Sequence, residues 1–344
     1  MRLGQWISLL ALAIAIYILW RIRQVLLLVF AAAVLATILN QVVKRLQQSR
    51  VKRGFAIAIT IFLLLVIIFS FFAIVLPRLI GQFQQLGNVL PIALDRLEIG
   101  YNWVQARVPG EVLADRGLNS VVQNLQTWIS QIFGSFFAIV SDSITIVLNL
   151  LLFVASTIMI LINPMQYRRV FIMAFPAFYR SRVSEILDEC EASLVGWIKG
   201  TLIAMFVIGI TSYIGLLILR VPLPLVNALI AGLLEFIPNL GPTLSVFPPA
   251  LLAVLDAPWK SFAVIGLYVL IQQFESLVLV PILMKHEVSL MPLFTLLSVV
   301  VFSVFFGILG TFLAVPLLIV LQIWLKEVLV KDVLNQWQES KSES

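Results

Sequence analysis

The sequence is poor in the side chains that most enzymes and metalloproteins need. Its 344 residues include one cysteine, Cys190, and one histidine, His286. A single cysteine cannot form an intramolecular disulfide or a site built from several thiolates. A lone histidine excludes motifs that need two, and the glycine-rich phosphate loop of the Walker type is missing from the sequence. We therefore expect a protein that is not an enzyme and that needs neither a cofactor nor a metal.

Charged residues are also scarce. Only 12% of the residues are charged and 61% are hydrophobic, whereas a soluble domain has about 25% charged residues. Several apolar runs approach the ~20 residues with which a helix spans a bilayer. The net charge of +6 comes from Lys and Arg that gather at the ends of these runs, which is how membrane proteins set their orientation. The composition predicts an all-α polytopic membrane protein whose surroundings are the lipid bilayer, with no nucleic-acid partner.

Basic residues predict which loops are cytoplasmic. One short loop after the second apolar run contains five of them and no acidic residue, and residues 163–199 contain five more. Lys326 and Lys331 follow the last apolar run, so the C-terminus is predicted to be cytoplasmic. Residues 77–143 have balanced charges and amphipathic spacing, which suits helices outside the membrane. The basic residues of the short loop are Lys44, Arg45, Arg50, Lys52 and Arg53.

A helix with two different faces is predicted to begin near Arg180. One face is apolar, and the other contains Glu185, Asp188 and Glu189. An acidic helix is not attracted to the anionic inner leaflet, so we expect this helix to pack on protein. The apolar face consists of Val183, Ile186, Leu187, Cys190, Leu194 and Trp197.

Two long apolar segments, 224–255 and 292–325, are each interrupted by proline or glycine. Such breaks free backbone polar groups that lipid cannot satisfy, so protein or a water-filled cavity must cover them. Paired broken segments in two halves of a chain indicate the substrate site of a membrane transporter. The residues at the breaks are Pro238, Gly241, Pro242, Gly307 and Gly310, with Pro316 beyond the second break.

Length favours re-entrant helical hairpins over single kinked spans. The two segments have 32 and 34 residues, and at 1.5 Å per residue the shorter one exceeds a single crossing by about 18 Å. Full spans are predicted before them, at 202–219 and 262–284. Two span-plus-hairpin units of opposite orientation result, which is the inverted-repeat plan of many transporters. A kinked, tilted span remains the alternative for each segment.

About eight membrane segments are therefore expected, two of them re-entrant hairpins. The chain is predicted to divide into N-terminal membrane segments (1–76), extracytoplasmic amphipathic helices (77–143), a membrane span (144–162), a cytoplasmic amphipathic linker (163–199), a transport core with the inverted repeats (200–325) and a cytoplasmic tail (326–344).

Polar side chains inside these apolar segments are the candidates for a solute or ion pathway. An ionisable group costs at least ~2.5 kcal/mol at the bilayer centre, so Glu235 and Glu275 need a reason to be there. They could exchange a proton, bind a cation or accept hydrogen bonds from a polar solute, helped by Asn239 and Gln272. In the structural alternative Glu235 caps the hairpin tip, Glu275 pairs with a polar neighbour, and the glycines only allow close helix packing.

The residues at the first break run Leu233-Leu-Glu-Phe-Ile-Pro238-Asn-Leu-Gly241-Pro242. This stretch resembles the IPxxGP signature of the autoinducer-2 exporter family, also called PerM-like permeases. The resemblance continues in order through Glu275 to Pro281, Leu290 to Leu293 and Phe306 to Leu317, and covers most of the chain. Thr201 departs from the family, whose members often have Gln there. The resemblance implies a homo-oligomer in a bacterial inner membrane.

Three functional hypotheses follow. The first is a secondary permease or exporter that moves a small polar solute by alternating access, for which the resemblance suggests an autoinducer-2-like signal. The second is a sodium–proton antiporter that uses Glu235 and Glu275. The resemblance also suggests this activity, because some members of the family are associated with sodium–proton exchange. The third is a membrane scaffold without transport, in which both hairpins only pack. A monovalent cation is the expected ligand under the second hypothesis.

Overall fold

The structure is a computed structural model that describes residues 10, 14–15, 17–70, 73, 77, 81, 127, 143–238, 240–283 and 292–334. Every regular element within these residues is a helix, as the composition predicts. The chain forms two compact units. Unit 1 comprises residues 1–62, 147–198 and 287–344, and unit 2 comprises residues 63–146 and 199–286.

Unit 1 contains the N-terminal and C-terminal helices and the charged half of α7. Five of its elements are fully described between residues 23 and 334. They are α2 (Arg23–Gln48), α6 (Pro164–Met173), the short helix η1 (Ala177–Tyr179), α13 (Pro292–Trp324) and the π-helical segment η3 (Leu325–Leu334). Two further helices, Arg53–Ser70 and α5 (Ser143–Ile162), have most of their residues in this unit.

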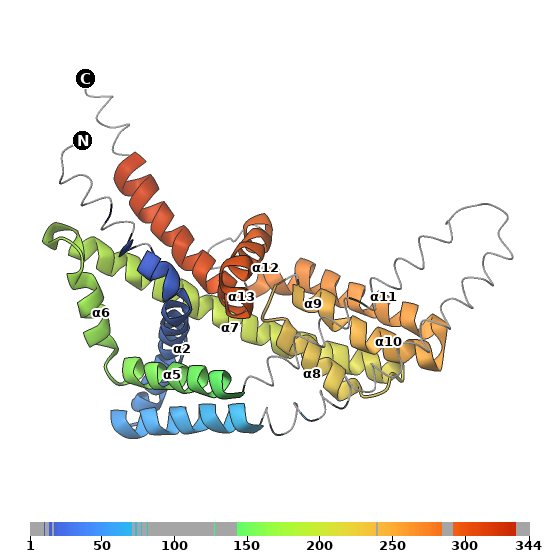
Figure 1. The fold of residues 1–344 in the computed structure, drawn as a ribbon. Helices are drawn as coiled ribbons and strands as arrows, with labels where there is room; N and C mark the ends of the chain where they lie inside the picture. The colour runs from blue at the N-terminus through green and yellow to red at the C-terminus, as the bar shows by residue number, and fades with distance from the viewer. Residues whose placement is uncertain are drawn as a thin grey trace. The chain divides into compact units, whose positions relative to one another are not determined.

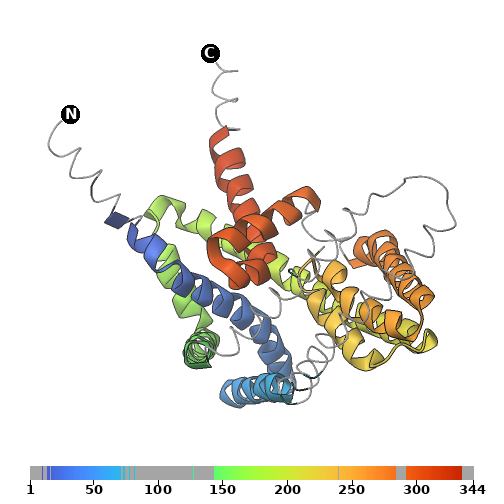
Figure 2. The ribbon, with the colours of Figure 1, turned by 45° about the vertical axis from the view of Figure 1, so that its right-hand side comes forward.

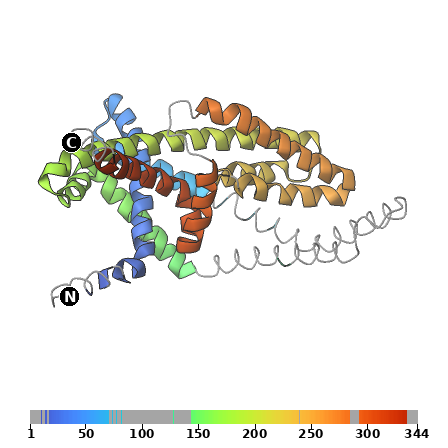
Figure 3. The same ribbon diagram turned by 90° about the horizontal axis from the view of Figure 1, so that it is seen from above.

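Unit 2 contains the second half of α7 (Arg180–Ile218) and the helices that follow it. Figure 3 shows α7, in yellow-green, as one long uninterrupted helix. The other helices are α8 (Pro224–Leu234), α9 (Leu240–Ser245), α10 (Phe247–Asp256), α11 (Pro258–Phe274), the π-helical turn η2 (Glu275–Leu279) and α12 (Val280–Leu283).

Within the described residues, five helices are long and apolar enough to cross a membrane, or six if the bent pair of α5 and α6 counts as one span. The helices of the first broken segment, Pro224–Leu234 and Leu240–Val254, are shorter than a full span. The polytopic helical architecture is therefore confirmed. The number of eight segments stays a prediction, as do the extracytoplasmic helices of 77–143, which lie almost wholly outside the described residues.

The basic loop near the N-terminus is shorter than predicted. Lys44 and Arg45 belong to α2, which continues through Gln48 as a helix of 26 residues. The predicted second apolar segment ended at Leu39, where polar residues begin to alternate with apolar ones, but a helix continues wherever its backbone hydrogen bonds continue. The connection to the next helix then contains Arg50 and Lys52, with Arg53 at the helix start.

The helix predicted to begin near Arg180 is confirmed, and its apolar face is buried. Val183, Ile186, Cys190, Leu194 and Trp197 are each less than 10% exposed. The helix packs on protein through this apolar face, as expected, while the acidic residues Glu185 and Asp188 stay largely exposed. Asp188 accepts a bond from Arg168 of α6, and Glu189 pairs with Lys326 of η3.

A network of polar side chains connects the start of α7 to η3 within unit 1; we call Tyr179, Arg182, Glu327, Lys331 and Asp332 the ionic network. Arg182 lies 2.7 Å from Glu327 and 3.3 Å from Asp332, and Lys331 lies 2.6 Å from Glu327. Tyr179 donates a hydrogen bond to Asp332. Glu327 is only 2% exposed, and a buried carboxylate needs such partners. The sequence analysis placed Glu327, Lys331 and Asp332 in the cytoplasmic tail and the other two residues in the linker 163–199, and it did not predict this network.

The carboxylates of this network stay ionised at neutral pH. The bond from Tyr179 lowers the pKa of Asp332, with a further contribution from Arg182. Burial alone would raise the pKa of Glu327, but Lys331 and Arg182 outweigh it and hold that pKa below its usual range. A lowered folded-state pKa gives stability that is present above the ordinary pKa of about 4 and is lost as the pH falls through the folded value. The network is therefore fully formed at pH 7.

The labelling rate of Cys190 measures how easily the helix α7 beside this network opens, because Cys190 is the only cysteine in the chain. Burial, with a smaller contribution from Glu189, raises the pKa of its thiol to about 12, so labelling by a maleimide requires local opening. We expect Arg182→Gln to label about tenfold faster than wild type at pH 7, a factor that corresponds to about 1.4 kcal/mol. Labelling kinetics followed by mass spectrometry measure this.

The matched control for that experiment is Arg180→Gln. It removes the same charge two residues earlier, but among the described residues Arg180 bonds only to the backbone oxygens of Phe175 and Met173. Its labelling rate should stay close to that of wild type. Equal rates for both variants would show that the ionic network does not hold α7 and η3 together.

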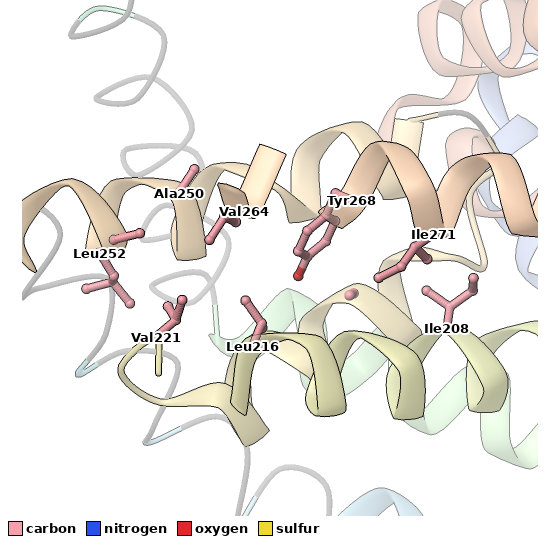
Figure 4. Close-up of a cluster of buried hydrophobic side chains, with 10 residues drawn as sticks. Ile208, Leu216, Val221, Ala250, Leu252, Val264, Tyr268 and Ile271 are labelled. Atoms are coloured by element: carbon pink, nitrogen blue, oxygen red, sulfur yellow. The ribbon is translucent and has the colours of Figure 1, made fainter. Parts of the chain in front are cut away.

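The core of unit 2 lies where α7, α10 and α11 meet. Figure 4 shows Leu216 and Ile208 of α7 facing Val264, Tyr268 and Ile271 of α11, with the Tyr268 ring pointing toward α7. These side chains are each at most 9% exposed. The apolar contacts fix α11 against α7, and this determines where the next turn, η2, presents its polar side chains.

The second broken segment, α13, changes direction at Gly307 (Figure 2). Its backbone there has φ 65° and ψ −146°, a combination that only glycine adopts without strain. A Cβ atom on Gly310 would lie 2.0 Å from the backbone oxygen of Phe302, so the chain is tightly folded here. Pro316 lies inside the following helix and is buried. The predicted break is thus confirmed, whereas its placement in the membrane as a hairpin stays a prediction.

Candidate functional site

The first broken segment forms two short helices around an irregular turn. Pro224 begins α8, and its fixed φ suits the first helical position. The helix ends at Leu234, four residues before Pro238, which lacks a backbone N–H and disfavours helix in the residue before it. The chain then turns, and α8 contacts both α9 and α10 (Figure 1). This turn fits the predicted hairpin.

Gly241 makes the turn possible by close backbone approach. Its N–H donates to the oxygen of Ile237 at 2.9 Å. A Cβ atom at this position would lie 1.8 Å from the backbone oxygen of Leu234, which is far inside van der Waals contact. The motif therefore needs glycine here for a steric reason, and Pro242 follows it in the first turn of α9.

Two carboxyl groups meet beside this turn. Glu235, the first residue after α8, is 6% exposed, and its carboxyl group lies within hydrogen-bonding reach of that of Glu275 at the start of η2. Gln272, one turn earlier on α11, donates to the Glu275 carboxylate at 3.3 Å. One oxygen of Glu235 has no hydrogen-bond partner in the described structure. We call Glu235, Gln272 and Glu275 the carboxyl cluster.

The backbone at Glu275 is also unusual. The five residues Glu275–Leu279 form a π-helical turn between α11 and α12. Such turns inside α-helices occur frequently at functional sites, because they change the direction in which side chains point. The sequence predicted an uninterrupted span here and gave no sign of this turn.

Unit 2 also buries polar groups outside the carboxyl cluster, and two of them, Ser212 and Tyr268, were missed by sequence reasoning. Ser212 is fully buried, and its hydroxyl faces that of Tyr268 outside good hydrogen-bond geometry. Asn227 is also fully buried; its Nδ2 donates to the oxygens of Pro222 and Leu223, each at 3.2 Å, while its Oδ1 has no partner in the described structure. Unpaired buried polar atoms are costly. Ser212 and Tyr268 have hydrophobic neighbours in the sequence, so they did not stand out from ordinary helix positions.

An apolar groove of about 390 Å³ runs along α7 and α8 in the same unit. Gly209 and Gly232 line it, and the two helices cross closely here, since a Cβ on Gly232 would lie 2.7 Å from the Met205 oxygen. The groove has almost no polar lining, so it offers no hydrogen bonds to a polar solute. Among the described residues the carboxyl cluster is therefore the better candidate for polar chemistry.

The predicted site residues divide between the two units. Unit 2 brings together Glu235, Gln272 and Glu275, with Pro238, Gly241 and Pro242 in the adjoining turn. Gly307, Gly310 and Pro316 belong to unit 1, and a shared pathway with the first break stays a prediction. Asn239 lies outside the described residues.

Comparison with known proteins identifies the chain. Residues 7–330 match the sequence model of the AI-2E transporter family, and this match covers nearly the whole chain. The protein belongs to the AI-2E transporter family. The carboxyl cluster, the Gly241 turn and the Gly307 bend all lie within this match. Membership in a family of transport proteins supports transport over enzymatic activity, and it places the protein among bacterial multi-pass membrane proteins.

Curated relatives of this AI-2E family member cover most of its length. YueF of Bacillus subtilis (strain 168), named as a candidate transport protein, is 26% identical over 83% of this chain and 79% of its own. PerM of Escherichia coli (strain K12), named as a candidate permease, is 26% identical over 90% and 86%. TqsA of the same organism, named an AI-2 transport protein, is 27% identical over 86% and 84%.

Proposed function

We propose that the protein is a secondary transporter that moves a small polar solute by alternating access, with the carboxyl cluster as part of the solute path. The observation that supports this most is the pair of carboxyl groups beside the first break. Glu235 is almost fully buried, and ionisable groups inside membrane segments are rare and usually functional. TqsA is named for AI-2 transport, so an autoinducer-2-like signal is the first solute to test.

The cluster offers both hydrogen-bond donors and acceptors to such a solute. The Gln272 amide donates, and the free oxygen of Glu235 accepts. Hydroxyl groups of a polar solute would bond to the carboxylate oxygens and replace part of the hydration that the solute loses. The backbone groups freed at the Pro238 turn add further partners. No special side chain beyond these is required.

The same pair supports coupling to protons. Two neighbouring carboxylates repel each other when both are ionised, so the pair favours a state in which it holds one proton. The pair can therefore take up a proton in one state and release it in another as its surroundings change. This supports proton-coupled export, and it is also the observation that favours sodium–proton exchange as the second candidate function.

Solute flux in proteoliposomes tests the proposal. We expect accumulation of labelled autoinducer-2 or another small polyol that depends on a proton gradient and vanishes with an uncoupler. A sodium-induced change of internal pH without solute flux would favour the antiporter. If folded protein shows neither activity across a broad panel of solutes and cations, the transporter proposal is wrong and a scaffold role gains support.

A further inference from the structure

A cavity in unit 1 opens where two predicted membrane spans end. It has a volume of about 600 Å³ and is lined by the start of the helix Arg53–Ser70, by the end of α5 and by the first residues of α6. Unlike the groove of unit 2, much of its lining is polar. The polar side chains are Arg53, Asn163, Gln166 and Arg169. We call it the Arg53–Arg169 pocket.

The helices around the pocket place it at the boundary between hydrocarbon and water. α6 turns by 91° from α5 directly after Ile162, so α6 runs along the membrane surface if α5 crosses it. Apolar side chains of α6 are nevertheless exposed, with Met165 at 71% and Val170 at 62%. A helix with this mixture of basic and exposed apolar residues suits the headgroup region of a bilayer.

The two arginines of the pocket are free to bind an anion. Within the described residues, no carboxylate pairs with Arg53 or Arg169. Arg53 donates one bond, at 3.3 Å, to the backbone oxygen of Ile162, which fixes it at the end of α5. The neighbouring Arg168 behaves differently, because it bonds to Asp188 at 2.6 Å. Asn163 makes no side-chain bond to the helix that it precedes, so its amide is also available.

From this geometry we infer that the Arg53–Arg169 pocket binds the phosphate of an anionic phospholipid. Arginine matches phosphate oxygens with two parallel donors. The exposed side chains of Ile162 and Met165, at 45% and 71%, line the pocket itself and suit contact with acyl chains. The positive-inside prediction assigns this face to the cytoplasmic leaflet, where anionic lipids attract basic residues.

Native mass spectrometry of the full-length protein tests this inference, with phosphatidylglycerol added to protein in mixed micelles of a neutral detergent and phosphatidylcholine. We expect one phosphatidylglycerol per chain to remain bound to wild type. The double variant Arg53→Gln/Arg169→Gln should bind it about tenfold more weakly, because both charge-assisted partners are lost. Arg53→Lys/Arg169→Lys keeps the charge and should retain part of the affinity, provided that size-exclusion profiles show folded protein.

The matched control is Arg45→Gln/Lys52→Gln, which removes the same charge from the side predicted to be cytoplasmic, at residues that do not line the pocket. This control variant should bind phosphatidylglycerol as tightly as wild type does. Equal losses in both double variants would overturn the inference in favour of a general basic surface. Soluble glycerol phosphate supplies the second arm: if it displaces the lipid at micromolar concentration, the ligand is a free phosphate compound and the lipid assignment is wrong.

Discussion

Glu235→Gln and Glu275→Gln are each expected to reduce proton-driven solute flux to the level of protein-free vesicles. Either substitution leaves an amide of similar size but removes one carboxyl group, so the pair can no longer take up and release a proton between its members. Solute moving down its own gradient should still cross, because the amide keeps hydrogen-bond partners for hydroxyl groups. Parallel flux measurements with and without an imposed pH gradient separate these two effects.

Asp256→Asn is the control for the carboxyl variants. Asp256 lies at the end of α10 in the same unit and pairs with Lys260 outside the carboxyl cluster. This variant should transport like wild type under both conditions. If Glu235→Gln and Glu275→Gln also keep full gradient-driven flux, the pair only packs and caps the turn, and proton coupling through it is excluded.

Gly241→Ala is expected to destabilise unit 2 by about 3 kcal/mol, at the upper end of overpacking penalties. The added methyl group would lie 1.8 Å from the Leu234 oxygen and 2.4 Å from the Leu234 carbonyl carbon. Both atoms belong to the backbone, so relief requires the α8–α9 turn to move rather than a side chain to rotate. The midpoint of denaturant unfolding in mixed micelles measures the loss.

Gly266→Ala provides the comparison for the same chemical change. Gly266 lies inside α11, and a Cβ atom there would meet nothing within 4 Å. Alanine favours helix over glycine by up to about 1 kcal/mol, so this variant should be as stable as wild type or more so. Equal stability of the two variants would mean that the tight turn at Gly241 does not form in the folded protein.

Much of the architecture was predictable because lipid imposes strong rules on sequence. Helices follow from apolar runs, since backbone polar groups must be satisfied internally in a bilayer. The first break follows from Pro238, because proline has no backbone N–H to donate. The second follows from Gly307, whose backbone conformation other residues avoid. The exact ends were less predictable, as α2 shows by continuing through Gln48 into polar sequence.

The candidate site was predictable only residue by residue. Glu235 and Glu275 stood out singly, because each is an acid in an apolar segment. That their carboxyl groups meet depends on where the turn after α8 lies within unit 2 and on the π-helical turn at Glu275. The burial of Ser212 and Tyr268 was equally unpredictable, since it results from the contact between α7 and α11.

By itself the sequence determined that this is a helical membrane protein with two broken segments, and that two acids lie in apolar segments, one of them at the first break. These properties are local, because hydropathy and the backbone limits of proline and glycine act within a few residues. Only the tertiary structure decided that Glu235 meets Glu275 and that Arg182 reaches Glu327, 145 positions later in the chain. Such contacts depend on how whole helices pack, and local sequence does not specify that packing.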